Sequence, residues 1–393
     1  YGDIPLLTRT YQIDEINSVE KTPFDKVIEF IVDECDKAAP ELPVSYKDFY
    51  NETGRATRGM AMSVKARALL YAASKLHNPS HATDKWEKAA KAAYDIIQTG
   101  WYTLPNIDVD PLYDVNGGNV ILNSSQLIFE RRNNDDNAFE SRNLPIGFEN
   151  GNSGNTPTQN LVDAYEMADG TPFSWENTKH ASKPYSGRDP RFYKAILYNE
   201  ASFMGTKIET FEGGRNASPI TGATLTGYYL RKYMNETVSL SPTNPIKKPH
   251  HFVLFRYAET LLNYAEAMNE LGGPDYTADE LPISARTALN KVRSAANMPD
   301  ITDNGDDFTA RLRNERRVEL AFEDHRFWDI RRWMIGDVVK DIYGVKITKK
   351  GSKYSYTPTK IQTRVWNEKM NLYPIAQSEI YKNGNLTQND GWE

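Results

Sequence analysis

The chain has 393 residues, of which 39% are hydrophobic and 25% charged, and its formal net charge is −6. This composition is typical of a folded protein rather than a disordered tail, and the negative charge argues against nucleic acid as a partner. No stretch approaches the 18 apolar residues of a membrane span, and the single cysteine, Cys35, excludes a disulfide framework and a cysteine-based zinc site.

Helical patterns fill most of the first hundred residues. Thr22 and Pro23 predict a helix start, and Pro40 is expected to end that helix. Two further helices are predicted over 57–76 and from 84 to about 99, because apolar residues recur there every three or four positions.

The next 150 residues have a different composition. Residues 101–250 contain 17 Asn and 12 Gly, and helical periodicity is broken everywhere except 158–168 and 189–198. We expect a long, loop-rich region with a few short strands, such as Tyr228–Tyr233. Irregular segments of this length are usually functional or disordered, and the aromatic residues scattered through this one favour an ordered structure.

Helical patterns return in the last third of the chain. Helices are predicted over 251–271, 281–297 and 307–335, and the tail, 336–393, is expected to be loop and short strand. We therefore predict a mainly α fold and a single domain over 1–393. Its helical scaffold would comprise 20–100 and 251–335, with antiparallel helix pairs at 57–99 and 251–297 that resemble tetratricopeptide pairs.

One predicted helix is unusually rich in charge. Between Arg311 and Arg332, 12 of 22 residues are Arg, Asp or Glu. Pairs four residues apart, such as Arg311 and Glu315, would face each other, and Val318, Ala321, Phe322, Trp328 and Ile330 would form an apolar face. This pattern favours a structural helix held in the core by ion pairs.

The alternative for this helix is catalysis. Glu319 or Glu323, with His325 and Asp329, could act as acid, base and orienting group, and two carboxylates across a cleft are what a glycosidase needs. Each carboxylate, however, has an arginine at helical spacing, which lowers the pKa of a group that would have to donate a proton. We favour the structural interpretation.

The sequence "RNERRVELAFEDHRFWDIRRW", 313–333, resembles the C-terminal signature of the RagB/SusD family. "YGDIPLLT" at 1–8, "LVDAYEMADGTPF" at 161–173 and "LYPIAQSEIYKNGNLTQNDGW" at 372–392 also resemble segments of that family, and the resemblance extends over nearly the whole chain. The residues that we assign to the structural signature are Glu315, Arg316, Glu319, Glu323, Arg326, Asp329, Arg332 and Trp333.

The resemblance implies a binding protein and not an enzyme. In that family the protein covers a SusC-like, TonB-dependent outer-membrane transporter in the manner of a lid. It captures oligosaccharides, or in some members peptides, at the cell surface. The resemblance also implies a lipid anchor, which together with the family's first helices and signal peptide lies outside this chain. A glycan ligand is expected, and no cofactor is predicted.

Sugar sites combine exposed aromatic rings with amide, carboxylate and guanidinium groups, and aromatic residues in loops are the better candidates. Two clusters fit, at 170–188 and 198–216, and Phe203 stands near the position where the family often carries a ligand-stacking tryptophan. The tryptophans in predicted helices, Trp86, Trp328 and Trp333, are expected in the core, and Trp101 and Trp366 are left open. The candidate ligand contacts are Trp175, Asn177, Tyr185, Phe203, Phe211, Glu212 and Arg215.

No metal site is predicted. His77 and His81 are four residues apart, but Pro79 between them would break the helix needed to align them. His250 and His251 are adjacent and would point in opposite directions on any regular element. Three alternatives to glycan binding stay open: a peptide ligand in the same role, a glycosidase, and a helical-repeat scaffold for other proteins.

Overall fold

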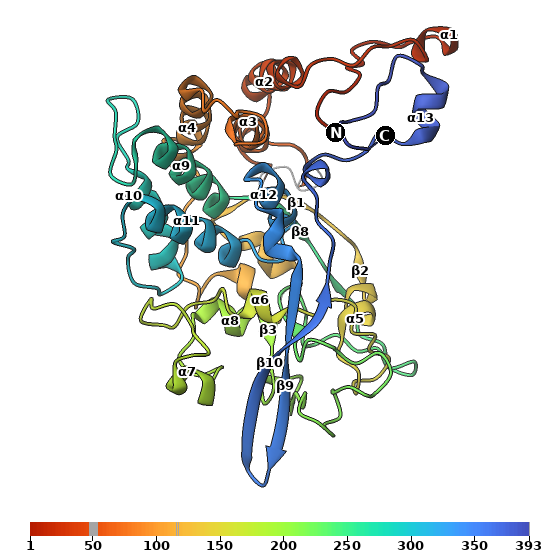
Figure 1. The fold of residues 1–393 in the computed structure, drawn as a ribbon, viewed down its shortest axis with the longest axis vertical. Coiled ribbons are helices and arrows are strands. Elements are labelled where there is room, and N and C mark those ends of the chain that lie inside the picture. Colours follow the sequence, from red (N-terminus) through yellow and green to blue (C-terminus); the bar gives the residue numbers. More distant parts are fainter. Residues whose placement is uncertain (47–53, 115, 117, 393) are drawn as a thin grey trace.

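The computed structural model describes residues 1–46, 54–114, 116 and 118–392. The protein has two parts along its longest axis (Figure 1). A helical part carries both ends of the chain, and a second part consists of loops, short helices and short strands. A long β-hairpin projects from the second part, at the end of the molecule farthest from the two termini (Figure 1).

The helical part is a stack of long helices. In order, α2 packs on α3, α3 on α4, α4 on α9 and α9 on α10, while α11 lies against α9. The predicted mainly α fold with stacked helix pairs is therefore confirmed. The bounds are α2 Phe24–Glu41, α3 Arg58–Ala73, α4 Thr83–Ile97, α9 Tyr257–Gly272, α10 Ala285–Ala295 and α11 Gly305–Glu319.

Small residues bring these helices close together. Ala90, Ala93 and Ala265 are fully buried in one core with larger residues such as Leu262. A methyl side chain lets helix axes approach while the leucines fill the remaining space. The core thus joins the helices on the two sides of the loop-rich region into one layer.

The segment before α9 is a strand and not the start of a helix. β8, Phe252–Arg256, pairs antiparallel with β1, Leu127–Arg131, so the helix predicted over 251–271 is wrong at its beginning. Val253 and Phe255 are buried while Phe252 and Leu254 are partly exposed, which is the alternation of a strand. The strand ends at Arg256, which is buried and lies directly before α9.

The charged segment also differs from the prediction. The helix expected over 307–335 is two helices, α11 and α12 (Arg326–Arg332), separated by a turn in which Phe322 and Asp324 have φ angles of 65° and 61°. Positive φ angles cannot continue an α-helix. Trp328 on α12 is 45% exposed, so its predicted place in the core is wrong, whereas Trp86 and Trp333 are buried as predicted.

A long hairpin lies after α12, where loop and short strand were expected. β9, Asp341–Lys350, and β10, Lys353–Thr363, pair antiparallel along almost their whole length. Gly344 fixes the base of the hairpin to the loop region, because an added Cβ there would lie 2.7 Å from the Thr226 Cα atom. At the tip of the hairpin, no atom lies within 4 Å of the position that a Cβ on Gly351 would occupy.

The loop-rich region contains only short elements. The expected strand at Tyr228–Tyr233 is limited to β6, and the two helices expected at 158–168 and 189–198 are α6 and α8. The bounds are α5 Ala138–Asn143, α6 Gln159–Val162, α7 Thr178–Ser182, α8 Pro190–Ala195, β2 Asp135–Asp136, β3 Ile196–Leu197, β4 Ser202–Phe203, β5 Thr206–Lys207, β6 Tyr229–Leu230 and β7 Lys248–Pro249.

A few short elements complete the chain, and Pro40 lies inside α2 rather than ending it. None of the helices in the described part of the chain is both long enough and apolar enough to span a membrane. The remaining bounds are α1 Ile13–Ile16, α13 Gln377–Lys382 and the 3₁₀ helices Pro111–Tyr113, Gly118–Asn123, Gly336–Val339 and Glu368–Asn371.

Candidate functional site

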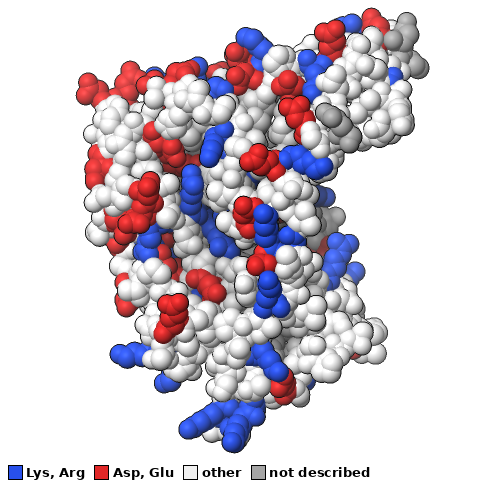
Figure 2. Space-filling model, viewed as in Figure 1, with Lys and Arg blue, Asp and Glu red and all other residues white. Residues whose placement is uncertain are grey.

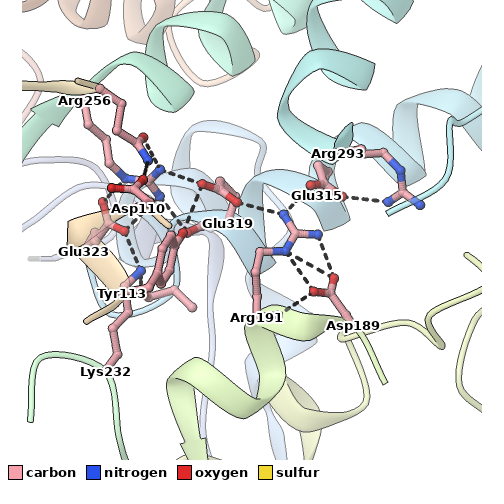
Figure 3. A network of polar contacts seen from close by, with 12 residues as sticks. Asp110, Tyr113, Asp189, Arg191, Lys232, Arg256, Arg293, Glu315, Glu319 and Glu323 are labelled. Carbon is pink, nitrogen blue, oxygen red and sulfur yellow. Dashed lines mark hydrogen bonds and ion pairs between the residues drawn. The ribbon is translucent and has the colours of Figure 1, made fainter. Parts of the chain in front are cut away.

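The charged residues of α11 lie at the centre of a buried network (Figure 3). Arg256, which is 1% exposed, donates to Glu323 at 2.7 Å and to Glu319 at 2.5 Å. The Lys232 ammonium group lies 2.6 Å from the second oxygen of Glu323. One arginine at the end of β8 therefore ties together the end of α11 and the turn that follows it.

The network continues on the other side of α11 (Figure 3). Arg191 on α8 bonds to Asp189 at 2.7 Å and to Glu319 at 2.8 Å, and it also pairs with Glu315. Arg293 on α10 donates to the other oxygen of Glu315 at 2.8 Å. Glu315 and Glu319 thus each join two arginines that come from other elements.

A second set of buried pairs connects α12 to α9. Asp329 accepts from Arg316 at 2.9 Å and from Arg332 at 2.8 Å. Arg332 also pairs with Glu266, which accepts at 2.7 Å from the indole N–H of Trp333. These side chains are between 1% and 5% exposed, so the network belongs to the core.

The predicted ion pairs exist, but not between the predicted partners. Arg311 lies 3.1 Å from Glu166 in the loop-rich region, whereas Glu315 pairs with Arg191 and Arg293. The pairing that we expected along one helix instead connects different helices. Arg326, at the start of α12, is half-buried.

This environment is unsuited to acid–base catalysis. Burial alone would raise the pKa of Glu319, but the guanidinium groups of Arg256 and Arg191 outweigh it and lower the pKa to about 2. For Glu323, Arg256 and Lys232 likewise outweigh burial and lower the pKa. Both groups are ionised at neutral pH and have no proton to donate.

Two of the predicted ligand contacts are core residues. Tyr185 is 8% exposed, and its hydroxyl lies 3.3 Å from that of Tyr228. Phe203 is 1% exposed and packs edge-on against Phe148 at 5.5 Å between ring centroids. Neither ring can present a face to a ligand, so the prediction of ligand stacking at Tyr185 and Phe203 is wrong.

The other residues of the first cluster are partly accessible. Trp175 is half-buried, its indole N–H donates to Asp163 at 3.1 Å, and its ring contacts Phe173 at 5.2 Å. Asn177 is exposed, and its side chain caps α7. A ligand contact at Trp175 stays a prediction, although one edge of the ring already has a protein partner.

The second cluster lies against the β9–β10 hairpin. The half-buried ring of Phe211 is 5.6 Å from that of Tyr354 on β10. Glu212 is exposed and pairs with Lys346 on β9 at 2.9 Å, and Arg215 is also exposed. The contact between this cluster and the hairpin was not predicted, because only loop and short strand were expected over 336–393.

A groove in the helical part has the composition of a sugar site. It is open, has a volume of about 870 Å³ and lies between α10 and the loop after α4. Fully buried Leu261 contributes to its lining, and two tyrosine rings border it with centroids 6.5 Å apart. We call it the α10 groove, and its accessible lining includes Tyr102, Asn106, Tyr257, Asn290, Lys291 and Ser294.

Local packing fixes the two tyrosines. The hydroxyl of Tyr102 lies where a Cβ atom on Gly59 would be, 2.0 Å from that position, so only glycine at this point of α3 admits the ring. Tyr257 begins α9, and its backbone N–H donates to the Gln126 carbonyl at 2.8 Å. On the far side of Tyr102 a smaller cavity, of about 270 Å³, is lined by Trp101 and Phe129.

This groove was not among the predicted ligand sites. The signal was present, because Trp101 and Tyr102 are consecutive aromatic residues in the loop that follows a helix. Only the structure shows that α10, nearly 200 residues later, forms the opposite wall.

The histidines considered as metal ligands have other partners. His81 lies 2.9 Å from Glu270, and His250 lies 2.7 Å from Glu140. His77 stacks on Phe24. Within the ranges that the structure describes, no three His, Cys, Asp or Glu side chains form a group that could hold a metal ion.

Comparison with known proteins places these features in a family. The SusD family model matches residues 123–392. A SusD-like protein of Formosa agariphila is 25% identical over 420 residues, which cover 99% of this chain and 68% of that protein.

Solved structures agree with this match. A SusD-like protein from Bacteroides fragilis has a TM-score of 0.81 and 26% identity, and the match covers 100% of this chain and 76% of that one. A SusD-like carbohydrate-binding protein from the same species has a TM-score of 0.78 and 27% identity, covering 98% of this chain and 75% of that one. The family model matches well over half of the sequence, and we conclude that this chain belongs to the SusD family.

Proposed function

We propose that the protein binds a glycan at the cell surface and that the α10 groove is its binding site. The similar structure from Bacteroides fragilis is described as a carbohydrate-binding protein, and the SusD family match supports the same role here. The observation that carries the site is the meeting of two tyrosine rings with amide, hydroxyl and ammonium groups in one open groove.

The chemistry of the groove suits a sugar chain. Sugars present apolar C–H faces that pack on aromatic rings, and hydroxyl rims that bond to amides and hydroxyls. Tyr102 and Tyr257 supply the rings, and exposed Asn106, Lys291 and Ser294 supply polar groups along the rim. An open groove of this kind admits a chain and leaves much of it in water, so a modest affinity is expected.

The wider role follows the family resemblance. In this proposal the protein delivers its ligand to a SusC-like, TonB-dependent transporter in the outer membrane, and a lipid anchor holds it at the cell surface. In this proposal it acts by binding and not by catalysis, which is supported by the buried cations that keep Glu319 and Glu323 ionised.

A glycan panel tests the proposal. We expect affinity electrophoresis to find one class of polysaccharide that retards the protein, with calorimetry giving the affinity. Ser294 is exposed on α10, so Ser294→Trp should fill the groove without disturbing the core and should lower the affinity about tenfold or more. Lys88→Trp on the exposed face of α4 is the matched control.

The outcomes separate the alternatives. Binding that survives Ser294→Trp but is lost with Trp175→Ala would move the site to the 170–188 loop. A protein that binds peptides and none of the glycans would overturn the glycan proposal in favour of the peptide alternative.

A further inference from the structure

Positive charge is concentrated on the β9–β10 hairpin and the segment after it. Residues 342–367 contain five lysines, one arginine and no Asp or Glu, whereas the whole chain has a net charge of −6. The rest of the chain therefore carries a net charge of −12. Figure 2 shows blue side chains at the end of the molecule where the hairpin of Figure 1 ends, and many red ones over the helical part.

None of the three lysines nearest the tip forms an ion pair within 4 Å in the described part of the chain, although the Tyr354 hydroxyl and the ammonium groups of Lys207 and Lys349 together lower the pKa of nearby Glu200. Lys346 pairs with Glu212 at 2.9 Å, and Lys360 lies 3.5 Å from Asp341. In the described part of the chain no carboxylate lies within ion-pair distance of Lys349, Lys350 or Lys353. Lys350 and Lys353 are moreover directly opposite each other in the ladder, an arrangement of like charges that weakens a hairpin.

Aromatic rings lie directly beside these cations. The Lys349 ammonium is 4.4 Å from the centre of the Phe211 ring and 5.3 Å from that of Tyr354. Both rings are partly exposed, and a hydrogen bond of 2.7 Å from the Tyr354 hydroxyl to Glu200 holds one of them in place. Phe211 comes from a loop far from the hairpin in sequence, so the fold brings ring and cations together.

Lysines on an exposed hairpin have a simpler explanation, since charge prevents two sheet edges from pairing. Edge protection accounts for the charge, but it requires neither aromatic rings nor two lysines facing each other at the tip. An acidic sugar would use the positive charge, the aromatic rings and the two facing lysines. Its ring packs on an aromatic face while its anionic group contacts an ammonium.

We propose that the hairpin tip, formed by Lys349, Lys350, Lys353, Phe211 and Tyr354, binds the sulfate or carboxylate groups of an anionic polysaccharide. This inference rests on the proposed glycan-binding function and specifies a class of ligand for it. The tip would capture a chain that the negative surface elsewhere repels, and the attraction would weaken with salt because the charges are exposed.

The test compares polymers that differ in charge. Dextran sulfate and uncharged dextran share a backbone, and polygalacturonate carries carboxylates in place of sulfates. We expect wild-type protein to bind dextran sulfate, polygalacturonate or both more tightly than dextran, and which of the two it binds distinguishes sulfate from carboxylate. The triple variant Lys349→Gln, Lys350→Gln, Lys353→Gln should lose about tenfold in affinity for the bound polymer.

A matched control separates position from net charge. Lys37→Gln, Lys88→Gln, Lys91→Gln removes three exposed lysines from α2 and α4, with the same change in net charge. It should stay within about twofold of wild type. Equal losses in the two triple variants, or no loss in either, would overturn the proposal.

Two further outcomes are informative. Binding to vesicles of anionic phospholipid that requires the three lysines, without binding to either charged polymer, would overturn the polysaccharide assignment in favour of a membrane surface. Binding of a neutral glycan that is sensitive to Ser294→Trp but unchanged by the hairpin variant, with no binding to the charged polymers, would overturn this inference and leave the proposed function standing.

Discussion

Two neighbouring segments of this chain are both rich in charge, but their charged side chains lie in different environments. Between Arg311 and Arg332, cations and anions are interleaved, and half of them are buried with partners contributed largely by other elements. From 342 to 367 there are only cations, on an exposed hairpin and the segment after it. The comparison shows that the arrangement of partners, and not charge content, separates a structural segment from a candidate binding surface.

The physical reason is the cost of removing charge from water. A buried charge is tolerated only when a partner and further hydrogen bonds replace its hydration. Arg256 and Arg191 meet this condition, since each contacts two or more carboxylates. The lysines at the hairpin tip are exposed, so a ligand can replace the water around their ammonium groups.

The largest expected effect comes from breaking the buried network. Arg256→Leu removes the partner that Glu319 and Glu323 share, so we expect the free energy of unfolding to fall by about 3–5 kcal/mol. Urea denaturation measures this change. A loss below about 1 kcal/mol would show that the network does not hold the core together.

Acid should weaken the same network. Glu319 has a pKa of about 2 in the folded protein, against 4.5 for an ordinary glutamate. Between these values the unfolded chain binds more protons, so stability is fully present above pH 4.5 and is lost as the pH falls toward 2. Thermal melting across this range should show a falling Tm, with a weaker dependence in Glu319→Gln. An unchanged Tm would contradict the assigned pKa.

The base and the tip of the hairpin should respond differently to substitution. At Gly344 an added Cβ would lie 2.7 Å from a backbone atom of Thr226, so Gly344→Ala should cost about 2–3 kcal/mol. At Gly351, where φ is +62° and no atom is near, Gly351→Asn should change stability by about 0.5 kcal/mol or less, because asparagine tolerates this conformation. Urea denaturation of both variants checks the contrast, which similar losses would contradict.

The smallest expected effect is on stability at the tip itself. Lys350→Gln with Lys353→Gln removes two facing like charges, so the free energy of unfolding should change by no more than about 0.5 kcal/mol, toward greater stability if at all. A loss of more than about 1 kcal/mol in urea denaturation would mean that these lysines are structural, like the arginines of the core.

The sequence predicted the long helices because their apolar residues recur at helical spacing, as at Trp86, Ala90 and Ala93 on α4. It missed the hairpin, where a proline, Pro358, lies within β10 and lysines and threonines occupy much of both strands, so apolar alternation is weak. Spacing along one helix also misassigned Arg311 and Glu315, whose partners lie in other elements.

The candidate site was harder to predict than the fold. Phe203 and Tyr185 lie in loop-rich sequence, but the short elements around them close over their rings. Pattern along the chain shows where aromatic residues occur, and it does not show which of them tertiary packing leaves exposed. The α10 groove depends on a contact between two distant parts of the chain, which no local pattern reveals.

The most direct test of the account is calorimetric titration of one glycan, identified by the panel, into wild-type protein, Ser294→Trp and Arg256→Lys. We predict that Ser294→Trp lowers the affinity about tenfold or more, while Arg256→Lys, if it remains folded, binds as wild type because the buried network is structural. Wild-type affinity in Ser294→Trp, together with lost binding in a folded Arg256→Lys, would contradict it.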